Sequence, residues 1–344
     1  MPRSPHERAT LDSVAATTGV SKATVSKVLN DRPGVSEATR KRVREALRDL
    51  QYAPTTHRIE ADSGRPRSVV VLFDTLVNLY ALKMLDGLVA EAQNQDVEIV
   101  PLVTSPLSPG PGRPLEPERI RDLHRRGHAG LLVVTTQLSR DLLRVCSELS
   151  FPVLAIDPVD ALDQSVVSVG SNTWGGGVQA TEHLLSLGHR RIGFVGGSST
   201  HAGLRERRAG YRAALEAAGI SEDPALVSEE GMAVAAEPAL RMLQLPDPPT
   251  AFFASSDPGA LMLVRELVRS GRRVPQDVSV VGYDDTYATL PAPAQLTSVH
   301  TPLAEVGQVA LATLLRMSEG IPPVANHVQL STSLVVRETS APPP

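Results

Sequence analysis

The chain has 344 residues, of which 42% are hydrophobic and only 3% aromatic, and its formal net charge is −4. This length exceeds one ordinary hydrophobic core and suits two or three domains, whose cores must be largely aliphatic. The single cysteine, Cys146, excludes an intrachain disulfide framework and a zinc site built from several cysteines, which fits a reducing cytoplasm. We interpret Cys146 as a small apolar residue of a helix over Asp141–Leu149.

Targeting segments are not evident in the sequence. The charged N-terminus is not followed by the apolar stretch of a signal peptide. No apolar run approaches the roughly 20 residues that span a bilayer. We therefore expect a cytoplasmic protein without a membrane partner.

The charge is unevenly distributed along the chain. Residues 1–67 hold 13 Lys and Arg against 8 Asp and Glu, a net charge of +5, so residues 68–344 carry −9. A basic N-terminal segment on an acidic body favours binding of that segment to a polyanion such as DNA.

The N-terminal segment has the pattern of a helix-turn-helix. Thr10 can cap a short helix that runs to Thr18, and Gly19 supplies the turn after it. Ser21 can cap a second helix, Lys22–Asn30. In such a motif the second helix lies in the major groove. Its early exposed residues would meet the bases, and its hydroxyls would hold phosphates.

A third, strongly basic helix is predicted after Ser36. Val43, Leu47 and Leu50 repeat at helical spacing in it and would close a small core with the first two helices. A bare helix-turn-helix pattern is a moderate signal, because a basic helix without a partner has similar composition. The complete string from Thr10 to Pro54 is more specific.

That string, TLDSVAATTGVSKATVSKVLNDRPGVSEATRKRVREALRDLQYAP, resembles the DNA-binding head of the LacI/GalR family of bacterial transcription regulators almost from end to end. The resemblance implies that Lys22, Ala23 and Lys27 read the bases of a double-stranded operator. Lys27 stands where the family usually has Arg, and it lacks the bidentate fork, so the preferred base should be held less strictly. The implied DNA-binding residues are Thr10, Ser21, Lys22, Ala23, Thr24, Ser26, Lys27, Asn30, Thr39 and Tyr52.

The linker, residues 55–67, departs from the family pattern. In the family this segment folds on DNA into a hinge helix, and a leucine wedges the minor groove. Ala61 stands at the wedge position, and Glu60 and Asp62 repel phosphates. We favour a flexible tether, with a shifted register that uses Ile59 as the alternative. Bending of the operator is therefore left open.

From residue 68 onward, β-rich runs alternate with amphipathic helices, which indicates parallel sheets covered on both faces. About 270 residues of this pattern suggest two α/β lobes, and the predicted helices include Ala81–Asn94, Gly175–Leu187 and Arg207–Ala218. The predicted strands are Ser68–Phe73, Glu98–Val103, Gly130–Val134, Val153–Ile156, Val166–Val169, Arg191–Val195, Ala251–Ala254 and Val278–Gly282.

The resemblance to the LacI/GalR family continues through the core, in Leu184–Val195, Arg207–Tyr211, Arg273–Asp285 and Leu296–Leu303. It implies a type I periplasmic-binding-protein architecture with three crossovers. The fold class is thus an all-α helix-turn-helix head plus a two-lobed α/β core. The expected domains are the head, 1–54, the linker, 55–67, the effector-binding and dimerisation core, 68–338, and a disordered tail, 339–344. The expected lobes are roughly 68–157 plus 286–320, and 158–285 plus 321–338.

Several predicted strands end in polar residues, where ligands of open α/β sheets bind. Asp74 and Asp157 follow two of them, and Ser256 and Asp284 follow two others. Asp257 is better explained as a cap of the next helix. The resemblance implies Arg207 and Asp284 as the main effector ligands, and we interpret Arg208 as a solvated neighbour. The secondary candidates are Asp74, Asn78, Tyr80, Thr135, Asp157 and Ser256.

The identity of the effector does not follow from the sequence. We favour a sugar or oligosaccharide, although the loop after Asp285 offers only Tyr287 as an aromatic platform. Trp174, the sole tryptophan, precedes three glycines at a helix start, where packing is the better explanation than stacking on a ligand.

The sequence thus indicates a homodimeric regulator, preferably a repressor, whose operator affinity is modulated by a small molecule. The direction of the coupling, the operator and a further tetramer are left open.

A solute-binding protein would share the core but not the basic head. An α/β enzyme is the second alternative, but we find no G-x-G-x-x-G after a strand, P-loop, G-x-S-x-G or metal-spaced histidines. We expect no catalytic activity, metal or cofactor. An architectural DNA-binding protein would leave about 270 residues without a role.

Overall fold

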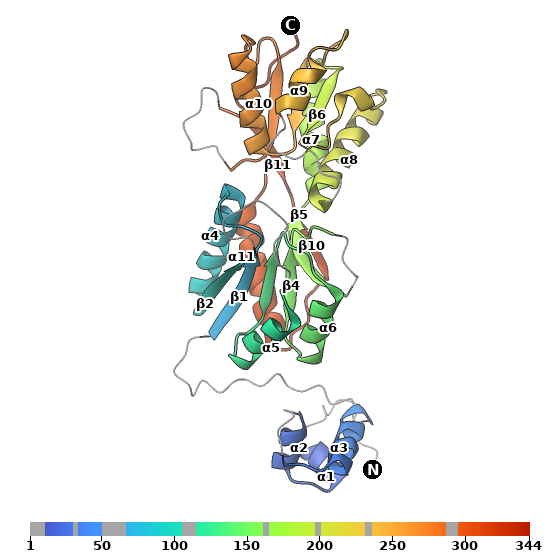
Figure 1. The fold of residues 1–344 in the computed structure, drawn as a ribbon, viewed down its shortest axis with the longest axis vertical. Helices are drawn as coiled ribbons and strands as arrows, with labels where there is room; N and C mark the ends of the chain where they lie inside the picture. Colours follow the sequence, from blue (N-terminus) through green and yellow to red (C-terminus); the bar gives the residue numbers. More distant parts are fainter. Residues whose placement is uncertain are drawn as a thin grey trace. The chain divides into compact units, whose positions relative to one another are not determined.

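The computed structural model describes residues 11–29, 34–49, 67–104, 115–160, 165–196, 201–230, 236–286 and 295–344. Its contacts divide the chain into two compact units, Met1–Ser63 and Gly64–Pro344. The first unit contains three helices, and the second contains all the described strands (Figure 1).

The first unit is the predicted helix-turn-helix followed by a third helix. Its helices are α1 (Leu11–Thr18), α2 (Lys22–Leu29) and α3 (Glu37–Asp49). Gly19 has a φ of 68°, which lets the chain turn between α1 and α2. Val25 and Val43 are fully buried in the small core between the helices. The apolar spacing in the sequence therefore predicted this unit correctly.

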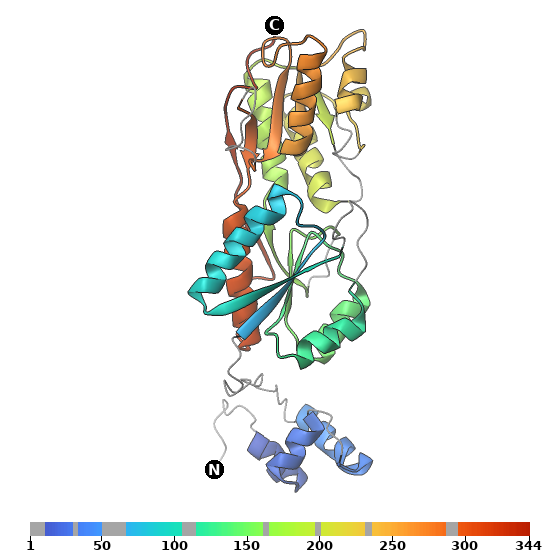
Figure 2. The same ribbon diagram turned by 60° about the vertical axis from the view of Figure 1, so that its left-hand side comes forward.

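The first lobe of the larger unit is built on a six-stranded parallel sheet with the order β10-β5-β4-β3-β1-β2. Helices α4 and α11 cover one face of this sheet, and α5 and α6 cover the other (Figures 1 and 2). The strands are β1 (Arg67–Phe73), β2 (Val97–Val103), β3 (Leu131–Val134), β4 (Val153–Ile156), β5 (Val167–Ser171) and β10 (His327–Leu330), and the helices are α4 (Leu79–Asn94), α5 (Pro117–Arg125), α6 (Arg140–Glu148) and α11 (Leu303–Ser318).

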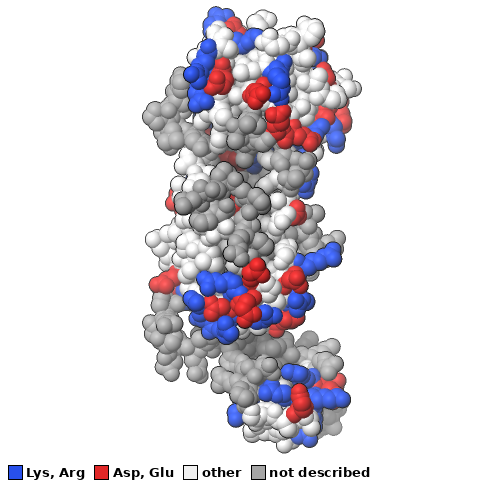
Figure 3. Space-filling view, in the orientation of Figure 1, with Lys and Arg blue, Asp and Glu red and all other residues white. Residues whose placement is uncertain are grey.

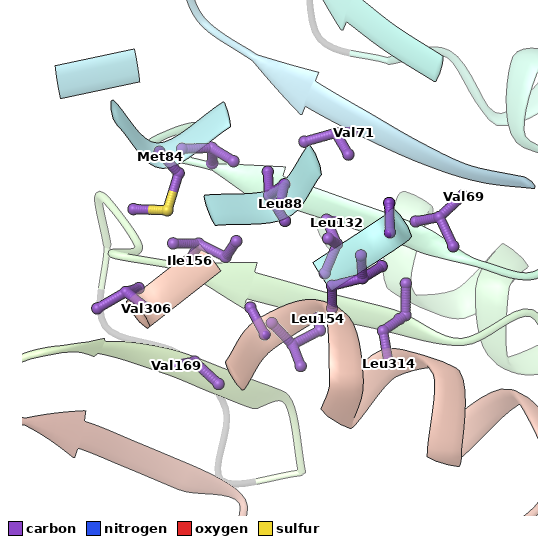
Figure 4. Close-up of a cluster of buried hydrophobic side chains, with 14 of the residues drawn as sticks. Val69, Val71, Met84, Leu88, Leu132, Leu154, Ile156, Val169, Val306 and Leu314 are labelled. Atoms are coloured by element: carbon purple, nitrogen blue, oxygen red, sulfur yellow. The ribbon is translucent and has the colours of Figure 1, made fainter. Parts of the chain in front are cut away.

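The core of this lobe is aliphatic, as the composition required. In Figure 4, Met84 and Leu88 of α4 and Leu314 of α11 lie against the strands, and all three side chains are fully buried. The single cysteine, Cys146, is buried on the opposite face in α6, and burial raises the pKa of its thiol to about 11. It is thus the inert apolar residue that the sequence predicted.

The second lobe is built on a five-stranded sheet with the order β11-β9-β8-β7-β6, in which only β11 runs antiparallel to its neighbour. Alternate residues of β7 point to opposite faces: Phe252 packs toward α9 and α10, and Phe253 toward α7 and α8. The elements are α7 (Thr173–Ser186), β6 (Ile192–Val195), α8 (Ala202–Ala217), the 3₁₀ helix η1 (Pro224–Leu226), α9 (Ala236–Met242), β7 (Ala251–Ala254), α10 (Asp257–Arg269), β8 (Ser279–Asp284), β9 (Thr297–His300) and β11 (Ser333–Val335).

The chain passes between the lobes three times, but the predicted lobe boundaries are wrong. Strands β5 and β10 belong to the first sheet, and β9 belongs to the second. The passages therefore fall between 171 and 173, between 300 and 303, and between 330 and 333. Apolar strands give the same local pattern in both lobes, and β10 pairs with β5 from a distant part of the sequence.

The C-terminal residues are ordered, which corrects the prediction of a disordered tail over 339–344. Thr339 is 1% exposed, and its carbonyl accepts a hydrogen bond of 2.7 Å from the amide of Val280. The carbonyl of Ala341 lies 2.8 Å from Nε2 of His189. Proline-rich composition suggested disorder, but the hydrogen bonds of these residues to Val280 in β8 and to the His189 side chain hold them in place.

Arg67, the first residue of β1, joins the start of the larger unit to the end of α11. Its guanidinium lies 2.9 Å from Oε1 of Glu319 and donates a 3.3 Å hydrogen bond to the carbonyl of Leu315. The last turn of α11 is thereby attached to the residue at which the linker ends.

Gly87 of α4 and Gly307 of α11 set the distance between these two helices. A Cβ atom on Gly87 would lie 2.0 Å from the carbonyl oxygen of Ala304. We expect Gly87→Ala to lower the free energy of unfolding by about 1–3 kcal/mol, because the helices must separate. Urea unfolding followed by circular dichroism measures the change. Gly203→Ala in α8 is the control, since its added Cβ meets nothing closer than 3.7 Å. Equal stabilities of the two variants would contradict the prediction.

Candidate functional site

The first candidate site is the outer face of the helix-turn-helix. Ser21, Lys22 and Lys27 are exposed, and Thr24 is half-buried. The Ser21 and Thr24 hydroxyls lie 2.9 Å apart, and Ser21 caps α2 by accepting a hydrogen bond from the amide of Thr24. The lysines of α2 are thus directed away from the small core, as a helix that enters a groove requires.

The other predicted DNA-binding residues divide into two groups. Ala23 and Ser26 lie on α2, and Thr39 lies in the first turn of α3, where its hydroxyl accepts a hydrogen bond from Ser36. Thr10, Asn30 and Tyr52 lie outside the described residues, as does Ala61 in the linker.

The second candidate site is a cleft of about 660 Å³ lined by residues of both lobes of the larger unit. The carboxyl ends of β1, β3 and β4 meet at its first-lobe wall, and the start of α8 and the end of β8 form the opposite wall. All eight predicted effector-binding residues line it: Asp74, Asn78, Tyr80, Thr135, Asp157, Arg207, Ser256 and Asp284. Because parallel strands end at one edge of a sheet, their terminal side chains converge.

An ion pair between Arg207 and Asp284 dominates the second-lobe wall. Nη2 of Arg207 lies 2.9 Å from Oδ1 of Asp284, and both side chains are about nine-tenths buried. The guanidinium also donates a 2.5 Å hydrogen bond to the carbonyl of Ser255 and lies 3.7 Å above the ring of Tyr283. Its Nε is buried and has no hydrogen-bond partner among the described residues.

Glycines of α7 allow this arrangement. A Cβ on Gly176 would lie 2.2 Å from the hydroxyl oxygen of Tyr283, and a Cβ on Gly177 would lie 2.2 Å from the carbonyl oxygen of Arg207. The glycine run thus lets α7 approach both Tyr283 and α8. Trp174, just before the run, is 48% exposed and is not among the cleft-lining residues, so it does not face the cleft and is only partly packed against the protein.

Two carboxylates lie on the first-lobe wall. Oδ1 of Asp157 accepts a 3.1 Å hydrogen bond from the amide of Ser171, and Oδ2 accepts one from the hydroxyl of Tyr80. Oδ1 of Asp74 accepts hydrogen bonds from the amide of Thr75 at 2.7 Å and from the Thr135 hydroxyl at 3.2 Å. Burial raises the pKa of both carboxyls. Both groups are held rigidly at the cleft surface.

Two predicted ligands also have structural roles, and one prediction needs correction. Asn78 caps α4 through the amide of Ala81, at 2.7 Å, and Ser256 caps α10. Asp257 is therefore not the cap. It is 1% exposed and accepts hydrogen bonds from the amide of Thr286, at 2.7 Å, and the hydroxyl of Ser298, at 2.5 Å. It ties α10 to the chain leaving β8 and to β9.

Sequence reasoning missed other cleft residues. His201 and Glu206 line the second-lobe side because α8 begins at Ala202, five residues before the predicted start. His327 and Gln329 line the cleft from β10, which was not predicted as a strand. The interpretation of Arg208 as a neighbour is confirmed, since it lies outside the lining and pairs with Glu222 at 2.9 Å.

The described part of the chain contains neither a cluster of metal-binding side chains nor a helix that could span a membrane. No three His, Cys, Asp or Glu side chains there are placed to hold a metal ion. Among those same residues, no helix is long and apolar enough to cross a bilayer.

A helix-turn-helix unit combined with a two-lobed α/β core and an interlobe cleft defines the class of ligand-responsive DNA-binding regulators. Comparison with known families agrees. Residues 10–55 match the family described as bacterial regulatory proteins, lacI family, and residues 181–340 match the periplasmic binding protein-like domain.

Relatives of known name extend the match to nearly the whole chain. The HTH-type transcriptional regulator CelR of Thermobifida fusca is 33% identical over 346 residues, which cover 96% of this chain and 98% of the relative. The HTH-type transcriptional repressor PurR of Aliivibrio salmonicida (strain LFI1238) is 31% identical over 314 residues, which cover 89% and 91%. The chain belongs to the LacI family of bacterial regulatory proteins and is a DNA-binding transcriptional regulator. The family and fold class predicted from the sequence are thereby confirmed.

Solved structures agree with this assignment. A CelR–cellobiose complex matches with a TM-score of 0.69 and 32% identity, covering 96% of this chain and all of that chain. The lac repressor dimer bound to operator and the anti-inducer ONPF matches with a TM-score of 0.68 and 26% identity, covering 97% and 100%.

The buried carboxyl of Asp257 should make stability depend on pH. Burial raises its pKa from 3.8 to about 7, so the folded state binds a proton that the unfolded state releases. Its contribution to the free energy of unfolding should therefore fall as pH rises from about 4 to 7, with a slope of at most about 1.4 kcal/mol per pH unit.

Urea unfolding of the wild type and Asp257→Asn across this pH range measures the contribution. The variant should have the flatter profile because its amide does not titrate. The exposed Asp141→Asn is the control and should keep the wild-type slope. Parallel profiles for wild type and Asp257→Asn would show that the Asp257 pKa is not raised.

Proposed function

We propose that this regulator is a repressor whose affinity for its operator is changed by a sugar or oligosaccharide bound in the interlobe cleft. The observation that carries the proposal is the cleft itself, in which the Arg207–Asp284 pair faces the carboxylates of Asp74 and Asp157. Fixed carboxylates accept hydrogen bonds from sugar hydroxyls, and the guanidinium of Arg207 lies in the cleft lining as a hydrogen-bond donor group. The related regulator CelR was solved as a complex with cellobiose, which supports a sugar as the effector.

The DNA-binding role falls to the helix-turn-helix. Lys22 and Lys27 are exposed on α2, so they can reach base edges while Ser21 and Thr24 hold phosphates. The proposed contact residues are those expected from the sequence: Thr10, Ser21, Lys22, Ala23, Thr24, Ser26, Lys27, Asn30, Thr39 and Tyr52.

We propose a homodimer, because one such head reads only one half-site. The related lac repressor is a dimer on its operator, which supports this assembly. A regulator bound to bacterial DNA works in the cytoplasm, on the nucleoid.

The two activities are coupled through the lobes. A ligand that contacts both walls favours a particular angle between them, and the chain passes between them three times. The coupling must be reciprocal and is typically about 1–3 kcal/mol. The cleft carboxylates serve binding in this scheme, and we propose that the protein is not an enzyme, as its relatives are transcriptional regulators.

Lys27→Ala should weaken specific DNA binding by about 1–3 kcal/mol, because a base contact in the major groove is lost. A duplex selected from a random pool by the purified protein serves as the operator in anisotropy titrations. Lys41→Ala on α3 is the control: it should leave the ratio of specific to nonspecific affinity unchanged. An unaltered ratio for Lys27→Ala would exclude base readout by this lysine.

Arg207→Ala and Asp284→Ala should abolish the response of DNA binding to sugar while leaving operator affinity intact. Each substitution leaves a buried charge without its partner in the cleft wall. Circular dichroism checks that the variants fold, and sugar-dependent anisotropy measures the response. Arg208→Ala, a matched change one residue outside the cleft, should respond normally. A normal response of Arg207→Ala would refute the assignment of the cleft.

A further inference from the structure

The cleft lining has a marked excess of negative charge. Arg205 and Arg207 are the lysines and arginines among its described lining residues, and both belong to α8 in the second lobe. The lining holds five carboxylates: Asp74, Asp157, Asp160, Glu206 and Asp284. The first-lobe wall therefore presents carboxylates without a lysine or arginine among its described residues, and His327 of β10 is its histidine.

The positive charge of Arg207 is already paired with a carboxylate of the protein. Its guanidinium pairs with Asp284 at 2.9 Å, donates to the Ser255 carbonyl and stacks on Tyr283. An incoming anion would have to compete with a buried carboxylate for this group. The pair thus offers little net positive charge to a ligand.

Among the described residues Asp74 has no basic partner, and hydrogen bonds satisfy only part of its carboxylate. Both of its described hydrogen bonds, from Thr75 and Thr135, end on Oδ1. Within the described residues, Oδ2 takes no hydrogen bond and no cation pairs with the group. On the outer surface, by contrast, basic and acidic side chains are interleaved (Figure 3), and Asp122 of α5 pairs with Arg126 at 2.9 Å and with Arg119 at 3.1 Å. Half-buried Asp74 lacks such a partner.

The described lining of the cleft offers little aromatic surface for stacking on a ligand. Tyr80 is the single Phe, Tyr or Trp among the described lining residues, and its hydroxyl is committed to Asp157. Charge and hydrogen bonding must therefore carry most of the selectivity, because the ring surface that commonly holds a neutral sugar is small.

We propose that the effector is an amino sugar, or a short oligomer of amino sugars, whose protonated amine pairs with Asp74. Its hydroxyls would meet Asp157 and Arg207, and phosphorylated or acidic sugars would be repelled. A ligand ammonium would supply the cation that Asp74 lacks, and charge-assisted hydrogen bonds are the stronger ones. This inference rests on the proposed function of the cleft as a sugar site.

Calorimetric titration of the full chain at neutral pH tests the proposal. The probes are glucosamine and its β-1,4-linked disaccharide, the N-acetylated forms of both, glucose, cellobiose, glucuronate and glucose 6-phosphate. We expect the free amines to bind at least about tenfold more tightly than the neutral sugars, and the acids not to bind, since hydrogen bonds to charged groups are stronger than those between neutral groups.

Asp74→Asn should remove this preference and bring the amines to the affinity of the neutral sugars. The exposed Asp141→Asn, which makes the same change of charge on α6, should preserve it. The affinity of the wild type for the amines should also fall with added salt and with acidification as Asp74 is protonated, whereas the affinity for neutral sugars should not depend on salt.

The outcomes distinguish failure of the amino-sugar proposal from failure of the proposed sugar site. Equal binding of amines and neutral sugars, or an unchanged preference in Asp74→Asn, would overturn the amino-sugar proposal and leave the sugar site standing. Preferential binding of glucuronate or glucose 6-phosphate would also overturn it. If no sugar of any charge binds, both the amino-sugar proposal and the proposed sugar effector fail.

Discussion

The buried ion pair between Arg207 and Asp284 is the interaction on which the cleft depends. Burying two charges is costly unless further groups satisfy them, and here the Ser255 carbonyl and the Tyr283 ring surround the guanidinium. Gly176 and Gly177 make room for that arrangement by letting α7 approach Tyr283 and α8. The geometry of the ligand wall is therefore set by the packing of two helices on the sheet, and its charge is nearly neutral before any ligand arrives.

Much of the site was predictable because its signals are local. A strand in a parallel sheet is a short apolar run, and the residue after it lies at the ligand edge, so Asp74 and Asp157 could be placed without knowledge of the strand order. The arginine of α8 came from the family resemblance. The boundaries of the first three helices followed from caps and apolar spacing, as Ser21 and Gly19 show.

The features that sequence reasoning missed depend on distant partners. Strand β10 alternates between exposed and half-buried residues at the sheet edge, and its pairing with β5 brings His327 to the cleft from more than 150 positions away. The position of Thr339 also depends on a distant partner. Its hydrogen bonds to Val280 could not be inferred from the composition of a proline-rich tail. Helix-capping preferences could not reveal the role of Asp257, because Ser256 occupies the capping position. The hydrogen-bond donors to Asp257, which are Thr286 and Ser298, come from other segments of the chain.

Helix α11 connects the two ends of the first lobe. It begins three residues after β9, where the chain has just left the second lobe, and its 16 residues extend about 24 Å to the turn that contacts Arg67. It packs closely against α4 at Gly87 and Gly307. A small tilt at the lobe junction is therefore magnified into a lateral shift at the far end, as in a lever arm. The residue that such a lever would displace is the one from which the DNA-binding head is tethered.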